Sequence, residues 1–314
     1  PYAASYMIIY LLGTVFVMTS LGLNPYINSQ GFARIGMLTV LLGAVANIVL
    51  DPIFIFALDM GVRGAAIATI ISQFLSAIWV LRFLTGRKAE LTMHFRGFRP
   101  DFVCIRKIAL LGTASFVMSF TDCLVQVACN AMLRQFGGDI YISVMTVINS
   151  VRQIAQTPVM AISDGASPVI SYNYGAHAFA RVRAAIRFMT QLAFGYTLLI
   201  WGLISAFPMF FIEIFNHEPE LLALAVPALH IYFFGFVMMA FQFSGQCVFK
   251  SLNKPRLAIF FSLLRKAVIV VPLTLWLPYV GGLGVNGVFI AEPISNLIGG
   301  CCAISQCASR LCRN

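Results

Sequence analysis

The sequence predicts an all-α membrane protein, a two-lobed helical bundle with parallel repeats. Composition, the spacing of apolar segments and an internal repeat support this fold class. Hydrophobic residues make up 60% of the 314 residues and charged residues only 10%, and the mean hydropathy is +0.89. An ordinary soluble domain has about 45 to 50% apolar and about 25% charged residues. A soluble fold could not bury this much apolar side chain.

Apolar segments long enough to cross a bilayer recur along the chain. A helix needs about 20 mostly apolar residues to cross hydrocarbon about 30 Å thick, because its backbone groups must bond to one another in lipid. Nine such helices are expected, over residues 4–23, 37–58, 62–84, 108–132, 141–163, 186–211, 222–249, 258–279 and 285–306. The chain opens with Pro1 and without a signal-like segment, so we expect a truncated N-terminus.

The formal charge of +10 is spread unevenly between alternate loops, which favours the positive-inside pattern of membrane proteins over nucleic-acid binding. The opposite loops contain only Arg63 and Arg134, together with several acids. The pattern predicts a cytoplasmic C-terminus. The basic residues assigned to the cytoplasmic side are Arg34, Arg82, Arg87, Lys88, Arg96, Arg99, Arg106, Lys107, Arg181, Arg183, Arg187, Lys250, Lys254, Arg256, Arg265, Lys266, Arg310 and Arg313.

The eight cysteines show no metal-binding spacing, so we expect no metal site. Most of them fall in apolar helices, which indicates packing in a reducing compartment. Lipid attachment at Cys307 or Cys312, near the expected membrane edge, is the alternative for these two.

Two segments of the sequence form an internal repeat. GVRGAAIATIIS (residues 61–72) and GVNGVFIAEPIS (residues 284–295) are identical at seven of twelve positions. Each follows an expected helix with one proline, Pro52 or Pro272, and the unit recurs after six helices. An even number of intervening helices gives both copies the same orientation, so the lobes should be parallel repeats. Chance similarity of two Gly- and Ala-rich helices is the alternative.

The repeat divides the chain into three parts. If each lobe has six helices, residues 1–84 hold the last three helices of the first lobe, and about nine of twelve helices are present. Residues 108–314 then form the second lobe with a short cytoplasmic tail. The basic segment 85–107, which contains Gly97 and Pro100 and has no sustained apolar face, is the expected cytoplasmic linker.

Ionisable side chains within the expected helices are candidates for function, because inserting one into a membrane costs about 2.5 to 3.5 kcal/mol. Asn47 and Asp51 stand four residues apart, which places an amide and a carboxylate on one helix face. Such a pair can hold a proton or a hard cation such as Na⁺. The alternative is that Asp51 accepts hydrogen bonds near a kink at Pro52. The other candidates are Asp122, Arg152, Asp164 and Glu292, with His230 and the helix-start pair Arg265 and Lys266 as secondary ones.

Four motifs resemble the multidrug and toxic compound extrusion (MATE) transporters, especially their bacterial drug-efflux branch. They are residues 47–52, 61–73, 165–176 and 287–295, in the order of that family, and the similarity runs over the whole chain. The family's first three helices have no counterpart. The resemblance implies that Asn47, Asp51 and Thr69 belong to a cation-coupling site in the first lobe, whose remaining acid lies on an absent helix.

In the second lobe the resemblance is incomplete. Glu292 takes the place of Thr69 when the repeats are superposed, and an unpaired carboxylate there could take up protons near neutral pH. Pairing with Arg152 or a cytoplasmic lysine is the alternative. Asp122 lies where some branches carry a coupling glutamate, but residues 222–249 contain no second acid. Asp122, Arg152 and Glu292 therefore form a candidate proton or substrate site.

The resemblance implies a monomeric secondary antiporter in a bacterial cytoplasmic membrane. It would export small amphipathic, often cationic compounds in exchange for H⁺ or Na⁺, with no further cofactor, and would contact lipid but no nucleic acid. A lipid-linked oligosaccharide flippase of the same superfamily is the alternative, although such proteins usually have a more cationic cleft than Arg152 alone provides. An intramembrane enzyme is the other alternative, and the one candidate histidine in an expected helix has no evident partner.

Overall fold

The computed structural model describes residues 2–90, 92 and 101–311, without the side chains of 2–5, 107, 111, 114, 255 and 302–311. It divides into two compact units, residues 1–100 (unit 1) and 101–314 (unit 2). The described residues form helices and short connections, which confirms the predicted all-α class. The expected linker lies partly outside the described residues. Within it, helix α4 already begins at Phe102, where Asp101 caps the helix by accepting a 2.9 Å hydrogen bond from the amide of Val103.

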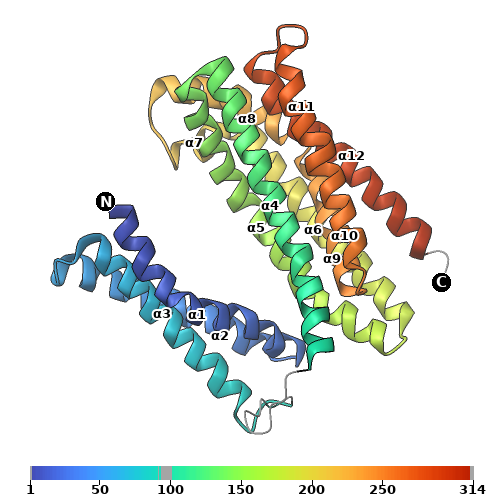
Figure 1. Ribbon diagram of the computed structural model, residues 1–314. Helices are drawn as coiled ribbons and strands as arrows, with labels where there is room; N and C mark the ends of the chain where they lie inside the picture. The colour runs from blue at the N-terminus through green and yellow to red at the C-terminus, as the bar shows by residue number, and fades with distance from the viewer. Residues whose placement is uncertain (1, 91, 93–100, 312–314) are drawn as a thin grey trace. The chain divides into compact units, whose positions relative to one another are not determined.

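Unit 1 consists of three long helices that lie side by side, blue to cyan in Figure 1. They are α1 (Tyr2–Ser29), α2 (Ala33–Pro52), which continues as the π-helical turn η1 (Ile53–Ala57), and α3 (Gly61–Leu84). Small residues bring the helices together: Gly43 of α2 faces Ser76 of α3, whose hydroxyl donates to the carbonyl of Thr39 at 3.1 Å. Close packing at small residues is typical of helices in membranes, where no hydrophobic effect drives their association.

Unit 2 contains the remaining helices, green to red in Figure 1. Its main core, around the fully buried Ile148, Phe233 and Phe289, joins helices far apart in the sequence. The helices are α4 (Phe102–Gly137), α5 (Asp139–Gly175), α6 (Phe179–Ala206), α7 (Pro208–Glu213), α8 (Pro219–Phe233), η2 (Phe236–Met238), α9 (Met239–Ser251), α10 (Pro255–Leu263), η3 (Leu264–Val270), α11 (Val271–Trp276), η4 (Leu277–Tyr279) and α12 (Val285–Leu311).

Six helical segments within the described residues are long and apolar enough to cross a membrane, and a seventh counts if α8 and α9 are one bent span. The continuous helix expected over 222–249 is wrong, because the chain bends by 44° between α8 and the η2–α9 segment. Gly235 lies at this break against Pro293 of α12, and a methyl group on Gly235 would come within 2.8 Å of the carbonyl oxygen of Pro293. The helix expected over 186–211 is also interrupted, at Phe207.

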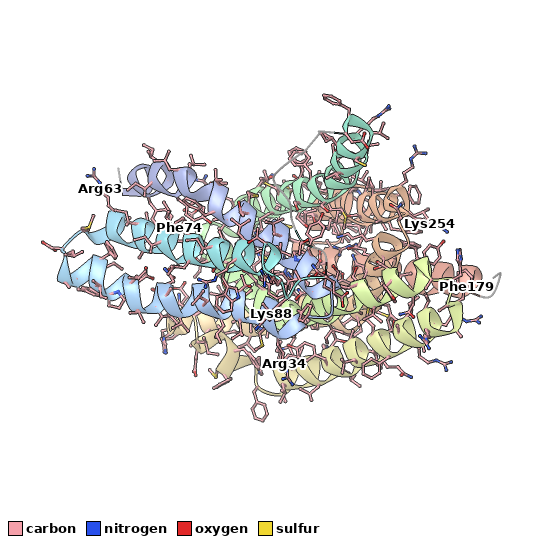
Figure 2. The ribbon with its side chains drawn as sticks, turned by 90° about the horizontal axis from the view of Figure 1, so that it is seen from below. Arg34, Arg63, Phe74, Lys88, Phe179 and Lys254 are labelled. Atoms are coloured by element: carbon pink, nitrogen blue, oxygen red, sulfur yellow. The ribbon has the colours of Figure 1, made fainter. Side chains whose placement is uncertain are left out.

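Figure 2 places several of the residues on which the expected charge asymmetry rests. Figure 2 shows Arg34 and Lys88 towards one end of unit 1 and Arg63 at the opposite end. In unit 2, Phe179 at the start of α6 and Lys254 before α10 lie near one end of that unit. In unit 1 this placement agrees with the sequence pattern, and the assignment of the basic end to the cytoplasm stays a prediction.

The two repeat copies use their glycines in the same way. The first glycine of each copy, Gly61 or Gly284, has a positive φ, of 52° and 51°. The glycine three residues later allows the new helix to touch the backbone of the preceding segment. A methyl group on Gly64 would lie 2.5 Å from the carbonyl oxygen of Phe54, and one on Gly287 would lie 2.7 Å from the carbonyl carbon of Leu277. The repeated sequence therefore encodes a tight turn followed by a close helix contact.

Replacing Gly287 by alanine is expected to destabilise unit 2 by about 1 to 3 kcal/mol, because the backbone of Leu277 and Pro278 must move to admit the methyl group. Gly202→Ala in α6 is the matched control, since nothing lies within 4 Å of the added methyl group. This control should be neutral or stabilising by up to about 1 kcal/mol. Thermal unfolding of the purified variants in detergent measures both effects, and equal melting temperatures would contradict the close contact.

Candidate functional site

The candidate site of unit 1 lies on α2 and α3. The amide nitrogen of Asn47 donates to Asp51 Oδ1 at 3.0 Å and lies 3.5 Å from the hydroxyl oxygen of Thr69. The Thr69 hydroxyl in turn donates to the carbonyl of Ala65 at 2.8 Å. The structure thus brings together all three side chains named from the sequence. In this arrangement the side-chain nitrogen of Asn47 faces Asp51 and Thr69. To bind a cation between them, the Asn47 amide would have to rotate so that its oxygen faces these two side chains.

The backbone beside Asp51 is irregular. Pro52 follows directly and has no amide hydrogen to donate, and the helix then widens into the π-helical turn η1. All three candidate side chains are only partly buried. The site therefore combines a partly exposed carboxylate with a point at which its helix can change direction.

Glu292 lies on α12 inside unit 2 and is 7% exposed. Its Oε1 is 3.2 Å from Nη1 of Arg265 and 4.0 Å from Nη1 of Arg152. The same Arg265 nitrogen donates to Asn296 Oδ1 at 2.9 Å. The expectation of an unpaired Glu292 is therefore wrong. Glu292 does pair with Arg152, as the alternative expected, at 4.0 Å. Its nearer partner is Arg265, at 3.2 Å.

Asp122 also has a basic partner that the sequence did not reveal. Its carboxylate forms an ion pair with Lys266, whose ammonium also donates to the carbonyl of Met118 at 3.4 Å. Met118 and Asp122 are one turn apart on α4, so a single lysine bridges two points of that helix.

Arg265 and Lys266 come from the π-helical segment η3, between α10 and α11. We expected both at a cytoplasmic helix start, but the structure buries them, each with 7% exposure. Two consecutive residues of a helix point about 100° apart, so their side chains reach different partners. The signal available in the sequence was that both residues fall within the expected helix 258–279 and not in the loop before it.

Five residues of unit 2 form what we call the charged cluster: Asp122, Arg152, Arg265, Lys266 and Glu292. Two cavities, of about 440 Å³ and 280 Å³, meet at this cluster, and four of its members line both. The larger cavity also reaches Asp164 and Lys250, and the smaller one includes Glu292. Among the described residues, no three His, Cys, Asp or Glu side chains gather as a metal-binding group.

Comparison with known proteins places this geometry in a family. Residues 114–276, about half of the chain, match the MatE family. The multidrug export protein MepA of Staphylococcus haemolyticus is 27% identical over 173 residues, which cover 55% of this chain and 38% of MepA. MepA of Staphylococcus aureus strain COL is 25% identical over 174 residues, again 38% of its length. The matched stretch therefore spans well under half of these curated relatives.

Solved structures extend the similarity to nearly the whole chain. The MATE multidrug transporter DinF-BH is 33% identical with a TM-score of 0.87, over 97% of this chain and 68% of that one. A MATE family multidrug resistance transporter of the MOP superfamily, in an outward-facing conformation, has a TM-score of 0.91 at 22% identity, over 98% and 69% of the two chains. The family match and the DinF-BH structure together show that this chain belongs to the MATE family.

Proposed function

We propose that this chain is part of a multi-pass secondary antiporter, which exports small amphipathic compounds from a bacterial cell in exchange for H⁺ or Na⁺. The observation that carries the proposal is that charged and polar side chains gather inside membrane-type helices, at Asp51 in unit 1 and around the cavities of unit 2. Intramembrane ionisable groups that line cavities are typical of substrate and ion pathways. Membership of the MATE family and the multidrug export function of MepA support export rather than catalysis.

Coupling requires that the ion and the exported compound prefer different conformations, because a ligand that binds both conformations equally shifts nothing. The electrical term supplies about 2.3 kcal/mol per charge per 100 mV. Asp51 is the proposed coupling carboxylate. Its protonation would change the hydrogen bond from Asn47 directly beside Pro52 and η1, where the helix can bend. We propose that this bend lowers affinity for the exported compound.

The remaining assignments follow from the family and the charge pattern. We propose a cytoplasmic-membrane location with the C-terminus in the cytoplasm, a monomer as the working unit, and lipid as its other partner. H⁺ or Na⁺ would be the only ion required for transport.

Ethidium efflux tests the function as a whole. Cells that lack their own pumps would express the complete gene, and efflux would be followed with and without a protonophore and at several Na⁺ concentrations. We expect energy-dependent efflux above the empty-vector rate. Loss of this efflux with the protonophore would indicate H⁺ as the coupling ion, and loss of it without Na⁺ would indicate Na⁺. A well-expressed protein that moves no ethidium would contradict export of cationic drugs.

A lipid-linked oligosaccharide flippase is the second candidate, and the charged cluster favours it more than the sequence did. Arg152 is joined there by the buried Arg265 and Lys266. Phosphate-bearing substrates need such cations. A flippase would leave ethidium in the cells and move a labelled lipid-linked sugar between leaflets of a reconstituted vesicle.

A further inference from the structure

We propose that the charged cluster of unit 2 binds the anionic group, a carboxylate or phosphate, of an amphipathic substrate. The inference rests on the proposed transport function and names its substrate class. It places acidic and zwitterionic compounds ahead of simple cations at this site.

The charge balance of the cluster is positive. Arg152, Arg265 and Lys266 supply three positive charges, and Asp122 and Glu292 supply two negative ones. The other charged residues that line the two cavities, Asp164 and Lys250, cancel each other. One excess positive charge therefore stays when every described acid lining the cavities is ionised.

The excess charge lies in a buried place. Arg265 and Lys266 are each 7% exposed, and the two arginines share one oxygen of Glu292. The Nε atoms of Arg152 and Arg265 are buried without a hydrogen-bond partner in the described structure. Buried cationic donors without acceptors are costly, and charge-assisted hydrogen bonds to an anion would satisfy them.

The cavities have room for such a substrate. Drug-sized ligands occupy pockets of roughly 300 to 1,000 Å³ that are mostly apolar with a few placed polar groups, and the larger cavity measures about 440 Å³. Its wall carries flexible apolar side chains near the cluster, including Met118, Met160, Met239 and Phe243. An amphipathic anion would place its charge at the arginines and its apolar part against these side chains.

The inference also restricts where antiport coupling can occur. Protonation of Glu292 or Asp122 would make the cluster more positive and would hold an anion more tightly. Proton entry there cannot release an anionic substrate. Release must then be coupled elsewhere, and our candidate is Asp51 in unit 1.

Three dansyl probes that differ mainly in the charge of one group test the site. Dansylglycine is anionic, its carboxamide is neutral, and N-(2-aminoethyl)dansylamide is cationic. Their binding to the complete protein in phosphatidylcholine nanodiscs would be measured by fluorescence, with empty nanodiscs subtracted and no ion gradient present. We expect dansylglycine to bind at least about tenfold more tightly than the carboxamide, since hydrogen bonds to charged groups contribute this much, and the cationic probe to bind most weakly.

Variants of opposite sign separate charge from folding defects. Arg265→Gln should remove the preference for dansylglycine, whereas Glu292→Gln should increase it, and a general loss of folding cannot do both. Lys254→Gln, the same loss of one charge at an exposed position, is the control and should leave the preference unchanged. If Arg265→Gln does not fold, binding of the three probes to the unaltered protein and to Glu292→Gln still tests the anion site.

The outcomes distinguish this inference from the proposed function. Equal binding of the three probes would overturn the anion site even if ethidium efflux succeeds. Preferential binding of dansylglycine without ethidium efflux would support the anion site and contradict the export of cations. Competition by phosphatidylglycerol in the nanodisc would identify a lipid headgroup as the anion, and competition by inorganic phosphate alone would identify a free one. Either result supports the site.

Discussion

Replacing Arg265 by leucine is expected to destabilise the folded protein by about 3 kcal/mol, because it leaves Glu292 buried without its nearest cation. This value is at the lower end for a broken buried ion pair, since Arg152 stays 4.0 Å from the same carboxylate oxygen. Unfolding of the purified protein in mixed micelles with increasing denaturing detergent measures the loss.

The double variant Arg265→Leu with Glu292→Leu should recover part of that stability, because it removes the unpaired carboxylate but leaves Arg152 without its acceptor at 4.0 Å. A buried ion pair gains little over apolar residues of similar volume, because burying both charges offsets their attraction. Arg134→Leu is the matched control. It breaks the 3.6 Å ion pair between Arg134 and Asp139, whose two side chains are 75% and 85% exposed. The variant should therefore lose no more than about 1 kcal/mol of stability. A double variant no more stable than the single one would show that Arg265 stabilises unit 2 through packing rather than through Glu292.

The contrast between the two candidate sites shows why the sequence predicted one better than the other. Asn47 and Asp51 are one helical turn apart, so their contact follows from helix geometry alone. Thr69 was added from the family motif, and the structure brings it to the same place. Arg265 and Glu292 are 27 residues apart on different helices, and no local periodicity connects them.

The helical class and the repeat were also open to prediction, because composition and glycine spacing are local properties. The break between α8 and α9 could not be predicted in this way. Residues 222–249 read as one apolar segment, and the bend becomes evident only when Gly235 meets Pro293 of α12. Likewise, hydropathy marks Arg265 and Lys266 as basic residues near a helix start, whereas their burial depends on acids supplied by α12 and α4. Tertiary partners decide such positions, and sequence order does not reveal them.

Replacing Asp51 by asparagine is expected to reduce ion-coupled efflux to the rate of cells that carry the empty vector. Asparagine has the size of aspartate but cannot gain or lose a proton, so the side chain would keep a partner in Asn47 and would no longer respond to the ion. The variant should still fold, and its affinity for the substrate should no longer change with pH or Na⁺, because the neutral amide cannot pass between the two charge states of Asp51.

Asp59→Asn supplies the matched control for this variant. Asp59 is an exposed acid of the same unit with a φ of 51°, a backbone conformation that asparagine adopts as readily as aspartate. Its efflux should equal that of the unaltered protein. If Asp51→Asn pumps normally under the same protonophore and Na⁺ conditions, coupling does not use this carboxylate. If dansylglycine binding to Asp51→Asn still changes with pH or Na⁺ as in the unaltered protein, another group carries the coupling. Loss of efflux together with a substrate affinity that no longer responds to pH or Na⁺ is the result that a coupling role requires, because the ion then no longer shifts the balance between the two conformations.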